Sequence, residues 1–301
     1  MSDTRSRLLA AAAGLAVLAI GVVLGSGPLR AALLGDLGEQ IDTLQTDLDG
    51  ARAQTDAERA RADAAVAYID GAAPAILAGL LPGSAVVIVV APGASDDAVA
   101  AIGARIGLAG GDLAGTVQLA DGWTDPATRP FRSALADQVA PSLVGVDSTD
   151  PEEILAEAFV QGSTGAAPTG TDLAEIDAAG ADRGAVLWDL LEQADLATGQ
   201  PAARADAVIV VAGSDGDATA GLVNAFSRYD APVTVAGAPA AVAPFAPGDA
   251  VATVAATGWT VGSVTVAATV AETVVGARPD YADGQVPGIL GDSGVPSGAD
   301  G

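Results

Sequence analysis

The first pattern along the chain is a long apolar run near the N-terminus. Leu8 to Leu29 contains no charged residue. A helix of that length, at about 1.5 Å per residue, spans about 30 Å, the thickness of a bilayer's hydrocarbon core. Arg5 and Arg7 precede the run and acidic residues follow it, so the positive-inside rule places the N-terminus in the cytoplasm. We therefore expect residues 1–30 to hold a single-pass cell-membrane anchor, with the bulk of the chain extracytoplasmic.

A cleaved signal peptide is the alternative interpretation of the same segment. Gly25, Ser26 and Gly27 are the small residues that a signal peptidase requires before its cleavage site. Cleavage after them would place Pro28 at the first mature position, where cleavage is poor. We therefore favour a retained anchor.

The second pattern is a heptad repeat. Apolar residues recur at alternating steps of three and four, with Asp, Gln, Arg and Glu between them, at Leu34, Leu37, Ile41, Leu44 and Leu48. This spacing is the a/d seam of a coiled coil, and it continues more weakly through alanines and Glu58. Pro74 and Pro82 are expected to end the helical region. The pattern predicts a coiled-coil stalk over residues 31–73.

A seam of this kind predicts an interaction between helices. The chain then forms a parallel homo-oligomer or pairs with a helix of a coiled-coil partner protein. The alternative is a single helix folded back on the globular part of its own chain. We favour self-association or pairing with a partner helix.

The third pattern is a strand–helix–strand unit that occurs twice. Val86 to Val90 and Ala207 to Val211 are continuous apolar runs, typical of parallel strands buried on both faces. Each is followed by a turn, a helical pattern and a further strand, near residues 84–120 and 206–237. Two such units predict an α/β fold class, here a Rossmann-like parallel-sheet domain over residues 84–278.

The remaining segments give weaker patterns. Residues 151–160 and 184–196 are amphipathic and predict helices, with a loop over 161–171 between them. The β-branched content of residues 260–275 indicates a strand, but its apolar spacing indicates a helix, which we favour. Residues 283–301 are rich in glycine and poor in apolar clusters, so we expect a disordered tail.

The composition excludes much chemistry. The chain has 38 acidic and 13 basic residues, a formal net charge of −25, no histidine, no cysteine, and Met1 as its one methionine. All the basic residues are arginine, so imidazole bases, thiolate nucleophiles and lysine Schiff bases are excluded. Strong acidity argues against nucleic acid as a partner. No feature supports an enzyme or a bound cofactor.

Two turns that follow the predicted strands are candidate ligand positions. Residues 92–97 and 213–217 carry backbone donors at a helix N-terminus, which can hold an anion. Neither matches a dinucleotide-binding or P-loop pattern, and their aspartates would repel phosphate. Turns with helix-capping side chains are the interpretation we favour.

A carboxylate cluster and three tryptophans complete the candidates. The carboxylates could hold a hard cation such as calcium, but they lack the spacing of a calcium loop; they are Asp147, Asp150, Glu152, Glu153 and Glu157. A solvated helix start is the interpretation we favour. Trp123, Trp188 and Trp259 are expected to be core anchors.

Several of these segments resemble an actinobacterial envelope family named for the mycobacterial copper-transport protein MctB. The most specific match is the stretch Leu18 to Gly27, LAIGVVLGSG, inside the predicted anchor. The heptad stalk, the strand Val86–Val90 and the unit Ala205 to Gly213 are also similar to the family's pattern. The resemblance implies a membrane-anchored envelope protein linked to copper efflux and homeostasis. It also implies association with cytokinesis, and it leaves an outer-membrane association open.

The sequence departs from the ligand set that direct copper handling requires. Cu(I) is bound by thiolate, thioether or imidazole, and no cysteine, histidine or internal methionine is present. We therefore predict no metal-ligating and no catalytic residues. Two hypotheses follow: a copper transporter by resemblance, or a non-enzymatic coiled-coil scaffold that recruits division or envelope machinery.

Overall fold

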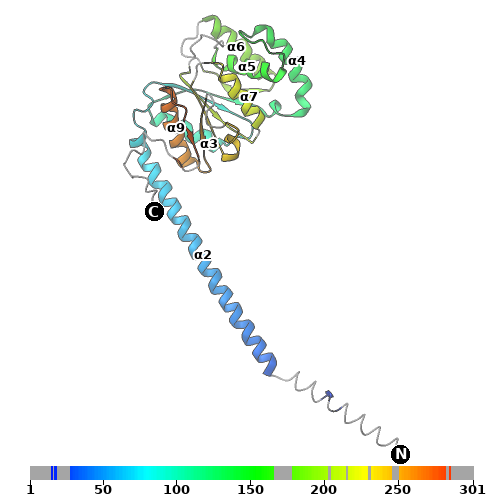
Figure 1. The fold of residues 1–301 in the computed structure, drawn as a ribbon, viewed down its shortest axis with the longest axis vertical. Helices are drawn as coiled ribbons and strands as arrows, with labels where there is room; N and C mark the ends of the chain where they lie inside the picture. Colours follow the sequence, from blue (N-terminus) through cyan, green and yellow to red (C-terminus); the bar gives the residue numbers. More distant parts are fainter. Residues whose placement is uncertain are drawn as a thin grey trace, which may run out of the picture. The chain divides into compact units, whose positions relative to one another are not determined.

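The computed structural model describes residues 15, 17–18, 28–165, 178–202, 205–214, 216–229, 232–245, 251–282 and 285. The chain divides into two compact units, Met1–Ala65 (unit 1) and Val66–Gly301 (unit 2). Figure 1 shows the helices and strands, coloured along the sequence. The anchor predicted over Leu8–Leu29 and the tail predicted over 283–301 lie almost wholly outside the described residues. Among the helices that are described, none combines the length and apolarity needed to cross a bilayer.

Helix α2 (Pro28–Leu77) contains the whole segment that was predicted as a stalk. From Leu44 to Tyr68 every side chain is exposed, including the large apolar side chains of Leu44 and Leu48. The helix is therefore observed, whereas its pairing into a coiled coil stays a prediction.

The helix ends later than its prolines predict, at Leu77 rather than before Pro74. Pro74 removes one backbone donor but lies in the last turn, where little of the helix remains to be disrupted. Ala73 and Leu77 are fully buried in the core of unit 2, and Arg105 forms an ion pair with Asp70. Burial of this apolar face stabilises the final turn.

Unit 2 is built on a sheet of seven described strands in the order β3-β2-β1-β4-β5-β6-β7. The strands are β1 (Ala85–Val90), β2 (Asp112–Leu119), β3 (Ala197–Gln200), β4 (Ala207–Val211), β5 (Val233–Gly237), β6 (Ala252–Ala255) and β7 (Asp280–Tyr281). All neighbouring pairs are parallel except β2 with β3, which is antiparallel. The α/β class with a mainly parallel sheet is therefore confirmed.

The order reverses between β1 and β4, as in a doubly wound sheet. These central strands pair in register, with Val86 opposite Ala207 and Ile88 opposite Ile209. Both are buried along their whole length, which explains their unbroken apolar sequences.

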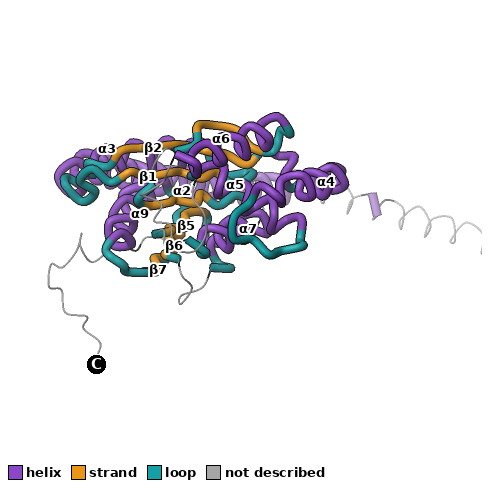
Figure 2. Tube along the Cα trace, turned by 90° about the horizontal axis from the view of Figure 1, so that it is seen from above, coloured by secondary structure: helices purple, strands orange, loops and turns teal. Residues whose placement is uncertain are grey.

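Helices cover both faces of the sheet. Alternate residues of β1 enter two different cores, because successive side chains of a strand point to opposite faces. One face carries α3 (Asp96–Leu108) and α9 (Trp259–Val274); the other carries α5 (Pro151–Thr164) and α7 (Gly216–Phe226) (Figure 2). Helices α4 (Arg129–Val139) and α6 (Ala178–Gln193) pack beside α5. Short helices η1 (Asp121–Trp123), η2 (Pro126–Thr128), η3 (Ala140–Ser142) and α8 (Pro239–Val242) connect these elements.

Several boundaries differ from the sequence-based expectations. The segment at 260–275 is a helix, as favoured. The loop expected from residue 161 is wrong at its start, because α5 continues to Thr164 and is capped by Gly165 in the left-handed conformation. Residues 154–165 are all buried, so packing on every side extends this helix beyond its amphipathic part.

Candidate functional site

The two strand-end turns that were candidate ligand positions pack directly against each other. A Cβ atom added to Gly213 would lie 1.8 Å from the carbonyl oxygen of Pro92. Gly93 has a φ of +76° and faces the side chain of Ser214. Ser95 Oγ accepts a hydrogen bond from Ala98 N at 3.3 Å and so caps α3. The chain itself therefore fills the crevice between these two turns, and the serine serves as a cap.

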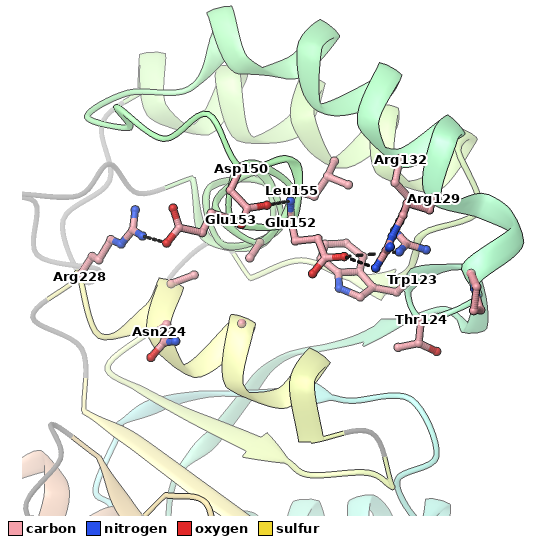
Figure 3. Close-up of a pocket in the computed structure, with 14 residues that line it drawn as sticks. Trp123, Thr124, Arg129, Arg132, Asp150, Glu152, Glu153, Leu155, Asn224 and Arg228 are labelled. Atoms are coloured by element: carbon pink, nitrogen blue, oxygen red, sulfur yellow. Dashed lines mark hydrogen bonds and ion pairs between the residues drawn. The ribbon is translucent and has the colours of Figure 1, made fainter.

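A cavity of about 500 Å³ lies elsewhere, between the segment from η1 to α4, the start of α5 and one face of α7. Its walls combine arginines, carboxylates and a tryptophan (Figure 3). The polar and aromatic residues that line it are Trp123, Thr124, Arg129, Arg132, Asp150, Glu152, Glu153, Asn224 and Arg228. It is the candidate functional site of the described chain.

Arg132 fixes one wall of the cavity. Its side chain is only 7% exposed and donates hydrogen bonds to the carbonyl oxygens of Gly122 (3.1 Å) and Asp125 (2.8 Å) and to Thr128 Oγ1 (2.7 Å). A buried guanidinium needs such acceptors to offset its desolvation. These contacts hold the turn that carries Trp123 against the first turn of α4.

The start of α5 supplies the acidic wall. Asp150 is the N-cap and accepts a hydrogen bond from Glu152 N at 2.9 Å, with Pro151 at the first helical position. Glu152 Oε1 lies 3.8 Å from Nη2 of both Arg129 and Arg132. Because Glu152 and Arg129 are largely exposed, these ion pairs are weak and open to exchange with a ligand.

Arg228 closes the opposite side of the cavity and covers a buried carboxylate. Its guanidinium lies 3.3 Å from Glu153 Oε1 and 3.0 Å from Glu157 Oε1. Glu157 is fully buried, and its Oε2 accepts a hydrogen bond from the hydroxyl of Tyr229 at 3.0 Å. Burial raises the pKa of Glu157 above its ordinary value of 4.5, although Tyr229 and Arg228 oppose the shift. Burial and the neighbouring Glu157 also raise the pKa of Tyr229.

An aromatic row connects the cavity wall to the core. Trp123 packs edge-on against Phe159 with ring centroids 6.0 Å apart, and Phe159 contacts Trp188 at 5.7 Å. Trp188 is buried as expected of a core anchor. Trp123 and Trp259 are only partly buried and pack against the edges of the two cores, so the core-anchor expectation holds in part for them.

The structure separates the members of the predicted carboxylate cluster. Asp150 caps α5, Glu152 and Glu153 face arginines, and Asp147 is exposed. Among the described residues, no group of three or more acidic side chains is arranged to hold a metal ion. The expectation that these carboxylates form a solvated helix start is wrong for Glu157, which lies among buried neighbours on α5. In the sequence, the signal for this burial was the position of Glu157 within an apolar stretch.

The predicted seam residues all lie in α2. The side chains of Leu34, Leu37 and Ile41 are outside the described part of the structure, and those of Leu44 and Leu48 are exposed. Their role in an interaction therefore stays a prediction.

Fold and site together define the class: an α/β protein with a charged cavity, in a chain that also carries a long helix. A family model described as "Copper transport outer membrane protein, MctB" matches residues 1–284, so the chain belongs to this family. The copper transporter MctB of Mycobacterium leprae (strain TN) is 39% identical over 143 residues. That alignment covers 47% of this chain and 45% of the relative, so it spans about half the length of either protein. The resemblance noted in the sequence is confirmed.

Proposed function

We propose that this protein is a membrane-anchored envelope protein that contributes to copper efflux and homeostasis. The observation that carries the proposal is the family match, which extends over residues 1–284 and so includes the apolar N-terminal run, α2 and the α/β domain. The name of the M. leprae relative, a copper transporter, supports the same role. Copper is the cargo of this function rather than a resident cofactor.

The chemistry of the chain favours an indirect contribution. Cu(I) prefers sulfur and imidazole ligands, and these 301 residues contain no cysteine, no histidine and Met1 alone. Arginine cannot bind a cation, and carboxylates prefer harder ions. In this proposal the chain supports a copper-exporting assembly through protein contacts, and its own side chains do not form the copper path.

The cavity beside α5 and the seam of α2 are the surfaces through which such contacts would form. The cavity offers weak, exposed ion pairs that a charged segment of a partner can exchange. The seam offers apolar side chains to another helix. The same two surfaces favour the second candidate function, a non-enzymatic coiled-coil scaffold that recruits cell-division or envelope machinery.

A deletion strain separates the two functions. Growth at graded copper concentrations and cell length are measured in the same cultures, with and without the wild-type gene in trans. Copper sensitivity with normal cell length supports the copper role. Abnormal cell length with unchanged copper tolerance overturns it in favour of the scaffold.

A further inference from the structure

The exposed seam of α2 differs from the part of the same helix that lies in unit 2. Leu44 is 67% exposed and Leu48 50% exposed, although both are large and apolar. By contrast, Ala73 and Leu77 are fully buried in the core of unit 2, and Ile69 packs against it. The apolar face of α2 is therefore covered at Ala73 and Leu77 and uncovered at Leu44 and Leu48.

The heptad register also assigns the charged residues that flank the seam. With Leu44 at d and Leu48 at a, Ala51 falls at d, Asp47 at g and Arg52 at e. In a parallel, in-register coiled coil of two chains, the residue at g of one chain lies beside the e residue of the next heptad in the other. Asp47 then lies beside Arg52 of the partner subunit, and twofold symmetry makes this contact twice.

We propose that a second copy of this chain covers the seam, parallel and in register, with Asp47 paired to Arg52 of the partner subunit. In the flanking heptads the g-to-e contacts join Gln40 to Gln45 and Gln54 to Arg59, so neither joins like charges. Glu58 falls at d, beside Glu58 of the partner subunit, and weakens the seam at that heptad. The inference rests on the proposed function in one respect: two copies anchored at their N-termini in one membrane can pair only in parallel.

An antiparallel pair gains little from the charge distribution of the stalk. The acidic residues of its first part, Asp36, Glu39 and Asp42, fall at positions c, f and b of the repeat and not at the seam-flanking positions e and g. They therefore cannot complement the arginines of a reversed partner at the interface. Within one chain, Arg52 lies 3.3 Å from Asp49, and both side chains are highly exposed, so Arg52 can exchange to a partner.

Single cysteines introduced into the full-length chain test the geometry, because the native sequence contains none. Ala51→Cys places a thiol at d, where identical residues of parallel, in-register chains face each other. Ala53→Cys, the matched control, places it at f on the outer side. A disulfide needs Cα atoms within about 7 Å. On oxidation with diamide, we expect the Ala51→Cys protein to form a covalent dimer and the Ala53→Cys protein to remain monomeric on a non-reducing gel.

Charge variants of the full-length chain test the named pair. Asp47→Arg and Arg52→Asp each place like charges across both contacts, and each is expected to raise the dissociation constant of the homodimer roughly tenfold. Mixing the two variant chains restores opposite charges at both contacts, so the heterodimer should form in preference to either homodimer. Asp63→Arg, at the outer b position of a later heptad and away from both members of the pair, is the control and should leave dimerisation unchanged.

Three results would each overturn the inference. They are equal cross-linking at positions 51 and 53, absence of cross-linking at position 51, and random mixing of the two charge variants. Neither experiment depends on copper. If the chain restores copper tolerance but does not cross-link at position 51, the parallel pair is refuted and the proposed function is not. If the chain cross-links at position 51 but does not restore copper tolerance, the proposed function is refuted and the parallel pair is not.

Discussion

At the scale of single residues, the side chains around Arg228 carry the most unusual chemistry of unit 2. Glu157 is fully buried, whereas the other acidic side chains whose burial the structure describes are exposed or only partly buried. Arg228 and Tyr229 contact its two oxygens, and Arg228 also reaches Glu153 at the rim of the cavity. A contact that draws Arg228 into the cavity would therefore also disturb the buried group.

Replacing Glu157 with alanine should destabilise the protein strongly. The change leaves the Tyr229 hydroxyl without its buried acceptor and Arg228 without one of its ion-pair partners, and should lower the free energy of unfolding by about 2–3 kcal/mol. Glu153→Ala removes a half-exposed acid from the same arginine and should change it by less than about 1 kcal/mol. Urea denaturation of the full chain measures both, and equal effects would show that burial of Glu157 contributes nothing.

The raised pKa of Glu157 predicts a definite pH dependence. The folded state binds this proton more tightly than the unfolded state, so the stability contributed by Glu157 grows as the pH falls toward the ordinary pKa of 4.5 and is lost as the pH rises through the folded value. Arg228, Tyr229 and Glu153 are the charged or titratable groups beside it. Relative to Glu157→Gln, the wild type should gain stability as the pH falls from 7 to about 4.5. If the free energy of unfolding of the wild type, relative to that of Glu157→Gln, instead decreased as the pH falls, the raised pKa of Glu157 would be contradicted.

At the scale of elements, the strands of the sheet centre were predictable and the edges were not. The strands β1 and β4 are buried on both faces, so their sequences carry an unbroken apolar signal. The edge strand β3 is Ala-Thr-Gly-Gln and mostly exposed, and β7 has two residues, so neither gives a pattern that local sequence can distinguish from a loop. Helix α4 was missed because its polar face and the proline at its start resemble a loop.

The cavity could not be predicted because its walls come from distant segments. Arg132, Glu152 and Arg228 are separated along the chain by other elements, and only the packing of α5 against α4 and α7 brings them together. Helix α2 is the opposite case, because a heptad repeat is a local pattern that predicts a helix from sequence alone; the pairing of its seam stays a prediction.

The contact between the turns that follow β1 and β4 gives a prediction at this scale. A methyl group at Gly213 would meet the carbonyl oxygen of Pro92 at 1.8 Å, so Gly213→Ala must force the central turns apart and should lower stability by about 2 kcal/mol or more. Gly107→Ala, in α3, meets nothing within 4 Å and should be neutral or raise stability by up to about 1 kcal/mol. Thermal unfolding of both variants checks this, and a neutral Gly213→Ala would refute the tight contact.

At the scale of the whole molecule, membership of the MctB copper-transport family contrasts with a composition that lacks soft metal ligands. A chain with a net charge of −25 attracts cations in general, but its carboxylates do not select Cu(I). The family role and the composition are consistent if the protein supports copper handling through an assembly, without ligating the ion itself.

Titration of the purified full-length chain with Cu(I) against a competing chelator tests the indirect role. We expect the chelator to retain the metal, with weak and non-stoichiometric binding to the protein, because carboxylates and backbone carbonyls suit harder ions. Calcium, titrated in parallel, serves as the control for non-specific binding to acidic residues. Tight binding of Cu(I) at one ion per chain would show that the ligand argument is wrong.

The central claim, a contribution to copper efflux, is tested most directly by the copper content of cells. Total cellular copper is measured by elemental analysis in the wild type, the deletion strain and the complemented strain after growth at one fixed external copper concentration. The account predicts that the deletion strain accumulates more copper than the wild type and that the complemented strain returns to the wild-type content. Equal copper content in all three strains would contradict it.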